Sequence, residues 1–250
     1  MKWIESEDGS FTAFSTQYGE HYHSTKDGAL NESLKKHIEP AFAIHSDKNH
    51  LKIIDICFGL GLNTLATLYY RDTYFPNTTL EIFSPELNGE LVASLVTFPY
   101  PDIFKSYLPV ITSLTECGVY EDAKTKITLV IADARLAMQE LSGVWDVCYQ
   151  DAFSPSANPL LWTREYFADV ARLMENEGIV TTYSIALAIR MGLHENGFNV
   201  YLNIGEGYRS ATVASMRLLC EFEKIDVEHK MRCNPGITSL CDVDYITLSV

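Results

Sequence analysis

Residues 51–65, LKIIDICFGLGLNTL, constrain the fold more than any other stretch of the chain. The run KIIDIC has the length and β-branched content of a buried parallel strand, and NTLATLYYR after it has helical periodicity. Gly59 and Gly61 therefore fall in a turn from strand to helix, where glycine lets the backbone bend sharply and approach a ligand closely. The stretch predicts an α/β fold in which this turn forms a ligand-binding cradle.

The residues around the two glycines distinguish between the cofactors that such a turn can bind. The dinucleotide fingerprint has a third glycine three residues after the second, and this chain has no glycine there. No Lys-Ser pair follows as a P-loop requires, so NAD and ATP are both disfavoured. Asp55, four residues before the first glycine, suits S-adenosylmethionine, because the methionine part of that cofactor is cationic and the molecule carries no pyrophosphate. An ordinary glycine turn without a ligand is the competing interpretation.

The composition predicts a folded and strongly acidic protein. The 250 residues include 19 basic and 33 acidic ones, a formal net charge of −14, so any nucleic-acid contact has to be local. The apolar runs are shorter than a membrane span and the start MKWIESEDGS is acidic, which predicts a cytoplasmic protein without a membrane contact. The six cysteines are scattered without a CxxC pair, which favours neither zinc nor disulfides.

Residues 1–50 are expected to form an N-terminal cap with a β-ribbon and a helix that stops at Pro40. The cap contains Glu20, His21 and His23, but two histidines on a strand without a third ligand nearby are more typical of structural or substrate-facing residues. No metal is therefore assigned.

Three later strands are each predicted to end at an acid. TLEIFSPE ends at Glu86, whose carboxylate can accept hydrogen bonds from both ribose hydroxyls of an adenosine cofactor, although capping of the next helix is a competing role. KITLVIAD ends at Asp133, which can meet the adenine amino group. VWDVCYQDAFSPSANPLLWT runs into Asp151 and then into a loop that Pro155 and Pro159 make rigid, although prolines that only end the strand and an Asp151 that caps the next helix are the competing interpretation. Parallel strands deliver all three acids to one edge of the sheet.

The rest of the chain is predicted to complete one domain over residues 51–219. Residues 99–124 lean towards helix, and TREYFADVARLMENEG is expected to form a helix that stops at Gly178. A buried strand, a further helix and two final strands follow. Residues 220–250 contain no clear motif and are treated as an extension of unclear role.

Taken together, these elements resemble a class I S-adenosylmethionine-dependent methyltransferase. The resemblance implies a Rossmann-like α/β fold, with a mostly parallel seven-stranded sheet, an antiparallel last strand, helices on both faces and the N-terminal cap. More narrowly, GEHYHSTKDGALNES, FGLGLNTL, FSPE, DAFSPSANPLLWT and GEGYRSATVAS resemble the tRNA 5-methylaminomethyl-2-thiouridine methyltransferase family. This is the methyltransferase half of the bifunctional enzyme MnmC; no oxidoreductase half follows here, as in the stand-alone form of the enzyme.

The narrower resemblance implies methylation of the amine of 5-aminomethyl-2-thiouridine at the wobble position of tRNA, with S-adenosylmethionine as the methyl donor. Asp151 would sit at the amine and orient it. Phe153 and Trp162 would stack on or wall the base, with packing in the core as the competing role for either ring. The residues implied to hold the cofactor are Asp55, Gly59, Gly61, Asn63, Glu86 and Asp133. Those implied to contact the substrate are Phe153, Pro155, Asn158, Trp162 and Arg209.

Two features leave the substrate open. Family members often carry a basic cluster in the last loop, where this chain has only Arg209, so Lys35, Lys36 and Arg190 are further candidates for binding the anticodon stem. The acidic composition also suits a polyamine synthase-like aminopropyltransferase, which uses decarboxylated S-adenosylmethionine, or another small-amine methyltransferase. A cofactor-binding protein without catalysis is the third alternative.

Overall fold

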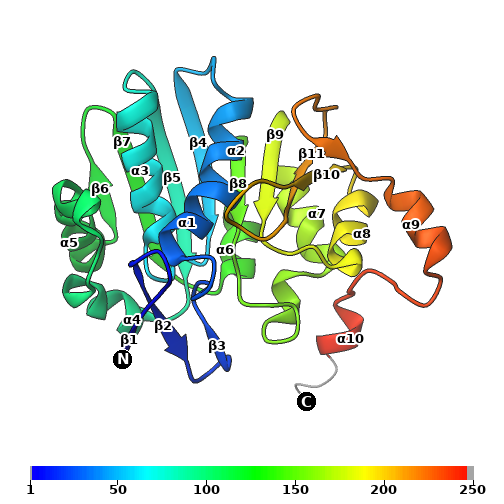
Figure 1. The fold of residues 1–250 in the computed structure, drawn as a ribbon, viewed down its shortest axis with the longest axis horizontal. Helices are drawn as coiled ribbons and strands as arrows, with labels where there is room; N and C mark the ends of the chain where they lie inside the picture. The colour runs from blue at the N-terminus through cyan, green and yellow to red at the C-terminus, as the bar shows by residue number, and fades with distance from the viewer. Residues whose placement is uncertain (1, 247–250) are drawn as a thin grey trace.

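The structure, a computed structural model, describes residues 2–246 and contains one nine-stranded sheet with helices on both faces (Figure 1). Five neighbouring strands are parallel, and β11 runs antiparallel between β9 and β10. In order across the sheet, the strands are β12 (Glu223–Lys224), β10 (Asn199–Asn203), β11 (Ala211–Ser215), β9 (Met174–Thr182), β8 (Trp145–Gln150), β4 (His50–Ile56), β5 (Thr79–Glu86), β7 (Thr125–Ile131) and β6 (Val119–Glu121).

The predicted seven-stranded sheet with an antiparallel last strand is confirmed, and two short edge strands extend it. The edge strand β6 comes from the region expected to lean towards helix, and β12 comes from the C-terminal extension. Each pairs antiparallel with its neighbour. The strand β4 lies in the middle and pairs Ile53 with Ile82 on one side and with Val147 on the other. Its central position buries both of its faces, which explains its nearly continuous apolar sequence.

Two hydrophobic layers enclose the sheet, one on each face. The first layer packs under the helices α1 (Ala29–Ser33), η1 (Leu34–Ile38), α2 (Glu39–Ile44), α3 (Leu62–Tyr74), α4 (Gly89–Ser94), η2 (Leu95–Thr97), η3 (Asp102–Tyr107) and α5 (Leu108–Cys117). The second packs under α6 (Ala134–Glu140), α7 (Arg164–Leu173), α8 (Leu187–Glu195) and α9 (Val227–Cys233). The short helices η4 (Pro159–Leu161) and α10 (Val243–Ile246) follow β8 and α9 along the chain. None of the helices within residues 2–246 has the length and apolar composition needed to cross a bilayer.

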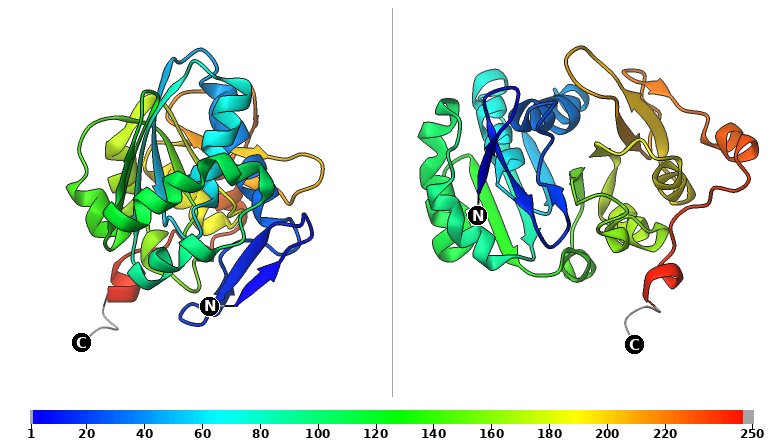
Figure 2. Two further views of the ribbon diagram at one scale, coloured as in Figure 1. Left: turned by 90° about the vertical axis from the view of Figure 1, so that its left-hand side faces the viewer. Right: turned by 60° about the horizontal axis from the view of Figure 1, so that its bottom comes forward.

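The N-terminal strands form a separate ribbon at the end of the sheet where the parallel strands finish (Figures 1 and 2). This ribbon consists of β1 (Trp3–Glu5), β2 (Phe11–Ser15) and β3 (Glu20–His21), all antiparallel. The chain then returns through α1, η1 and α2, which pack against α3 and β9. The expected cap therefore covers the edge to which the sequence assigns the acids.

The expected helix stop at Gly178 is wrong. The helix α7 ends at Leu173, and β9 begins at once with Met174 and contains Gly178. A Cβ atom on Gly178 would lie 3.0 Å from the carbonyl oxygen of Asp146, at an irregularity in the pairing of β8 with β9. The glycine thus permits a close approach between two strands instead of ending a helix.

Candidate active site

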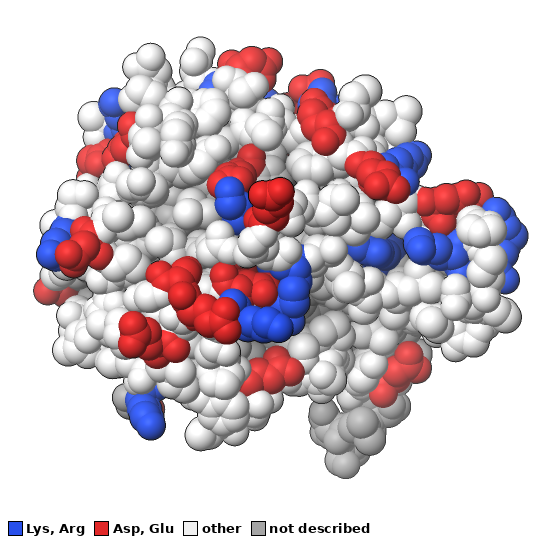
Figure 3. All heavy atoms as spheres, in the orientation of Figure 1, with Lys and Arg blue, Asp and Glu red and all other residues white. Residues whose placement is uncertain are grey.

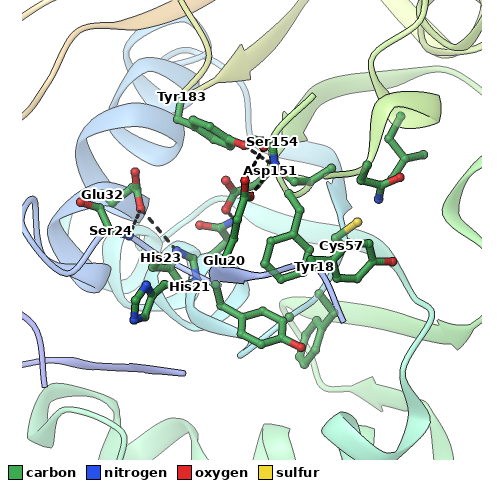
Figure 4. A pocket seen from close by; sticks show the side chains of 18 of the residues that line it. Tyr18, Glu20, His21, His23, Ser24, Glu32, Cys57, Asp151, Ser154 and Tyr183 are labelled. Carbon is green, nitrogen blue, oxygen red and sulfur yellow. Dashed lines mark hydrogen bonds and ion pairs between the residues drawn. The ribbon is translucent and has the colours of Figure 1, made fainter. Parts of the chain in front are cut away.

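A cavity of about 640 Å³ lies between the carboxyl ends of the central strands and the N-terminal ribbon (Figure 4). The glycine turn after β4 and the residues after β5, β7 and β8 form its floor, and residues 17–26 form its opposite wall. The predicted site residues that line it are Gly59, Asn63, Glu86, Asp133, Asp151, Phe153, Asn158 and Arg209. Asp55, Gly61, Pro155 and Trp162 are not among the lining residues.

The two glycines of the turn have different surroundings. Gly59 faces the cavity with φ 54°, and a Cβ atom there would lie 3.4 Å from the ring of Tyr22. Gly61 begins α3 with φ 72°, and a Cβ atom there would lie 2.9 Å from the ring of Phe58. Gly61 is thus needed for the packing of the turn, while Gly59 keeps the cavity surface open. Cys57, at the start of the turn, is the one residue other than glycine in the described range with a positive φ, 65°.

Glu86 is buried at the end of β5 and supports the glycine turn from below. Its Oε2 accepts a hydrogen bond from the backbone N–H of Gly59 at 2.9 Å, and its Oε1 accepts one from the N–H of Asn88 at 2.8 Å. Burial raises the pKa of the carboxyl, and these N–H donors offset part of that rise. Asp133 is exposed at the start of α6, where its Oδ1 accepts from the N–H groups of Arg135 and Leu136. Both acids therefore brace backbone as well as facing the cavity.

Asp151 follows β8 directly and has a side chain that is only 8% exposed. The Nδ2 group of Asn63 donates to its Oδ2 at 2.9 Å, and Nε2 of His37 lies 3.5 Å from its Oδ1. Burial by itself would raise the pKa of this carboxyl, but His37, His23 and Asn63 outweigh burial and hold the pKa below its ordinary value. The cavity therefore contains a nearly buried carboxylate that stays ionised.

Asp55 lies deeper than Asp151 and does not reach the cavity. The expected direct contact of Asp55 with the cofactor ammonium is therefore corrected. Its carboxylate accepts hydrogen bonds from the Thr64 hydroxyl at 2.9 Å and from Nδ2 of Asn63 at 3.3 Å. Burial and the nearby charge of Asp151 raise its pKa to about 7. Asp55 and Asp151 both accept from the amide of Asn63, but their pKa values are shifted in opposite directions, and Asp151 is the more readily ionised of the two.

The loop after Asp151 is held by side chains from several parts of the chain. Glu20 of the ribbon accepts a hydrogen bond from the N–H of Ser154 at 3.0 Å, and the Tyr183 hydroxyl donates to the carbonyl of Ala152 at 2.9 Å. The ring of Phe153 stacks on Tyr18 with centroids 4.4 Å apart. The loop is therefore clamped to the cap as well as stiffened by its prolines.

Trp162 belongs to the support of this loop and not to its exposed surface. Its side chain is completely buried, and its indole N–H donates to the carbonyl of Phe153 at 2.7 Å. Of the two roles expected for this ring, packing in the core is the one observed, because the ring lies in the second hydrophobic layer. The contact with a substrate base is therefore corrected.

Three of the four basic residues considered for anticodon-stem binding are not available as a free cationic patch. Lys36 is buried between Asp27 and Glu32 at 2.8 and 2.7 Å, and Arg190 is buried against Thr212. Lys35 pairs with Glu39. Arg209 contacts Asp27 at 3.0 Å but keeps 67% of its side chain exposed at the cavity rim. On the face shown in Figure 3, basic and acidic side chains are intermixed instead of gathering into one basic surface.

Several cavity residues were not predicted from the sequence as site residues. Tyr18, Tyr22, Glu32, Cys57 and Tyr183 line the cavity, and His37 reaches Asp151 from behind it. Glu20, His21 and His23 line the cavity (Figure 4). This position agrees with the substrate-facing role that the sequence allowed for the two histidines. The dense polar and aromatic run GEHYHS was the available signal. Among residues 2–246, no three His, Cys, Asp or Glu side chains form a group that could hold a metal ion.

Comparisons with known proteins agree with this geometry. A family model described as S-adenosyl-L-methionine-dependent methyltransferase matches residues 102–217. An uncharacterized protein of Methanocaldococcus jannaschii is 30% identical over 204 residues, which cover 78% of this chain and 53% of that protein. The tRNA 5-methylaminomethyl-2-thiouridine biosynthesis bifunctional protein MnmC of Ralstonia nicotianae is 31% identical over 217 residues, covering 82% of this chain and 33% of that protein. The chain thus spans about half of the first relative and a third of the second.

The crystal structure of MNMC2 from Aquifex aeolicus has the same fold almost throughout. It superposes with a TM-score of 0.86 at 28% identity, covering 97% of this chain and 79% of that one. With the sheet order and the cavity at its carboxyl edge, these matches identify an enzyme that uses S-adenosylmethionine. The chain belongs to the class I S-adenosylmethionine-dependent methyltransferases and, among them, to the MnmC methyltransferase-like family.

Proposed function

We propose that this enzyme methylates a primary amine, that of 5-aminomethyl-2-thiouridine at the wobble position of tRNA. The observation that carries the proposal is Asp151, an ionised acid in the cavity wall on a loop clamped from both sides. The similarity to MnmC proteins supports the choice of the tRNA nucleoside as the acceptor.

The residues around the glycine turn fit S-adenosylmethionine. Gly59 leaves room at the cavity floor that a Cβ atom would take, and Glu86 offers carboxylate oxygens where a ribose can donate its hydroxyl hydrogens. We assign cofactor binding to Gly59, Asn63, Glu86 and Asp133, with Asp55 and Gly61 supporting the turn from behind. When bound, the cofactor supplies an electrophilic methyl group.

Asp151 performs the main task of the protein side chains in this proposal. Its carboxylate accepts an N–H hydrogen bond from the amine, which orients the nitrogen lone pair, and its charge stabilises the positive charge that develops on nitrogen. Phe153, stacked on Tyr18, and Asn158 both line the cavity and would bound the base. Because the carboxylate is ionised by its own partners, it acts as an orienting acceptor rather than as a strong base.

The acid-rich cavity keeps a small polyamine as the second candidate acceptor, because Glu20, Glu32 and Asp151 all line it. A radiolabel assay with S-adenosylmethionine separates the two. We expect methyl transfer to tRNA isolated from a strain that lacks the gene, and none to putrescine or spermidine. Mass spectrometry of the wobble nucleosides from that strain should show accumulation of 5-aminomethyl-2-thiouridine. Normal nucleosides together with labelled polyamine would reverse the assignment.

Arg209 is the proposed phosphate contact at the cavity rim. Replacing it in Arg209→Ala should weaken tRNA binding about fivefold at low salt and reduce the slope of log affinity against log salt by about one. Filter-binding titrations from 50 to 200 mM salt measure both quantities.

Arg232→Ala is the matched control for Arg209→Ala. Arg232 lies on α9, is 66% exposed against 67% for Arg209, and likewise pairs with an acid, Glu228. Its loss removes the same charge away from the cavity, so the salt slope should stay as in the wild type. If both substitutions change the tRNA affinity and the salt slope equally, Arg209 contributes only through the net charge of the protein and not through a phosphate contact.

A further inference from the structure

A buried histidine of the cap, His37, lies directly behind the carboxylate of Asp151. His37 belongs to η1, is completely buried, and is absent from the cavity lining. Its Nε2 lies 3.5 Å from Oδ1 of Asp151, and its Nδ1 lies 2.9 Å from the Thr181 hydroxyl. The ring also packs edge-on against Tyr149, with centroids 5.6 Å apart. Two strands that are distant from η1 in sequence, β8 and β9, thus fix this ring next to the proposed catalytic acid.

The partners of the ring determine where its proton lies. An ionised Asp151 can only accept a hydrogen bond, so Nε2 of His37, which faces it, has to carry a hydrogen. Nδ1 has the hydroxyl of Thr181 as its own partner. Within the described residues Nε2 makes no hydrogen bond, and the carboxylate of Asp151, 3.5 Å away, is the polar group that it faces. A buried donor without another partner favours an ionised acid beside it.

His37 and Asn63 hold opposite oxygens of the same carboxylate. Asn63 donates to Oδ2, and His37 faces Oδ1, which fixes the plane of the group. The titratable groups that act on Asp151 from the surrounding elements are His37 of η1, His23 after β3, Asp55 of β4, Cys57 of the glycine turn and Tyr183 after β9. Of these, His37 contacts the carboxylate directly and does not line the cavity.

We propose that His37 is a positioning residue of the methyl transfer, which holds one oxygen of Asp151 so that the other lone pairs of the carboxylate face the acceptor amine. This inference rests on the proposed function, since it assigns to Asp151 the role of binding the amine. His37 itself touches neither the amine nor the cofactor.

Two substitutions separate the donor from the volume of the ring. His37→Phe keeps a ring of similar size and removes both nitrogens, whereas His37→Gln keeps an amide donor near the position of Nε2. The control is His45→Phe, because His45 is equally buried, belongs to the end of α2 and bonds the carbonyl of Asp146 away from the cavity.

The first measurement is the titration of the Asp151 side chain by carbon NMR of the ligand-free protein labelled with ¹³C-aspartate, assigned with Asp151→Asn. We expect His37→Phe to raise the Asp151 pKa by about one unit or more, and His37→Gln to restore most of the wild-type value. His45→Phe should leave it unchanged. An Asp151 titration that is the same in the wild type and in His37→Phe overturns the proposal, as does a Gln variant that behaves like the Phe variant.

The second measurement is the pH profile of turnover. Activity requires the ionised acid, so a raised Asp151 pKa moves the acid limb of kcat to higher pH. At neutral pH the acid stays ionised in both proteins, so a change there reports orientation alone. We expect His37→Phe to lose about 10- to 100-fold in kcat at neutral pH because the carboxylate is no longer held, while the dissociation constant of S-adenosylmethionine changes less than about threefold. If the wild type methylates no tRNA, the proposed function fails, and the NMR titration alone then decides whether His37 keeps Asp151 ionised.

Discussion

Asp151→Asn is expected to reduce methyl transfer by roughly a thousandfold or more, because the amide offers the amine no charge and half the acceptor oxygens. The dissociation constant of S-adenosylmethionine should stay within about tenfold of the wild-type value, since the proposed role of the acid is to bind the acceptor amine rather than the cofactor. Single-turnover assays with saturating cofactor, together with calorimetric binding, measure the two quantities separately.

Asp146→Asn provides the control from β8, the strand that leads into Asp151. Asp146 belongs to β8, pairs with Lys48 and accepts a hydrogen bond from the N–H of Lys52 at 2.7 Å. Burial opposes its ionisation, but Lys48 and Lys52 hold the pKa of Asp146 below its ordinary value, so its loss should lower the melting temperature without changing kcat per folded molecule. Retained turnover in Asp151→Asn would remove this acid from the mechanism and favour a cofactor-binding protein without catalysis.

The edge acids could be predicted from the sequence because strand periodicity fixes where each strand ends. Glu86 ends β5, and Asp133 and Asp151 follow β7 and β8, and parallel strands bring their carboxyl ends together. The same reasoning cannot decide which way a side chain turns. Asp55, inside β4, faces the start of α3 and not the cavity, where Thr64 satisfies it.

The contribution of the cap could not be predicted for a different reason. His37 meets Thr181 across 144 positions of sequence, and Glu20 meets Ser154 across 134. Such contacts depend on how the cap packs on the finished sheet, which local periodicity does not record. Lys36 illustrates the consequence: its sequence position suggested an exposed cation, and the packing of η1 buries it between two acids.

Glu86→Gln should raise the dissociation constant of S-adenosylmethionine by about 10- to 100-fold while leaving kcat at saturating cofactor within about threefold. A hydrogen bond to a charged acceptor contributes about 1.5–3 kcal/mol, and each 1.4 kcal/mol changes affinity tenfold. S-adenosylhomocysteine should lose affinity by the same factor, because both molecules carry the ribose. Glu90→Gln removes the same charge four residues later, at an exposed position of α4, and should leave both constants unchanged.

The role of Glu86 in the glycine turn has to be separated from its proposed role at the ribose, because its oxygens also accept the N–H groups of Gly59 and Asn88. A deoxyribose analogue of S-adenosylhomocysteine makes that separation. If Glu86 binds the ribose, the analogue binds the wild type about as weakly as the natural ligand binds Glu86→Gln, and the variant no longer distinguishes the two ligands. If Glu86 only braces the turn, Glu86→Gln binds both ligands more weakly by the same factor. The variant then still binds the deoxyribose analogue more weakly than S-adenosylhomocysteine, as the wild type does. The second pattern would move ribose recognition away from β5.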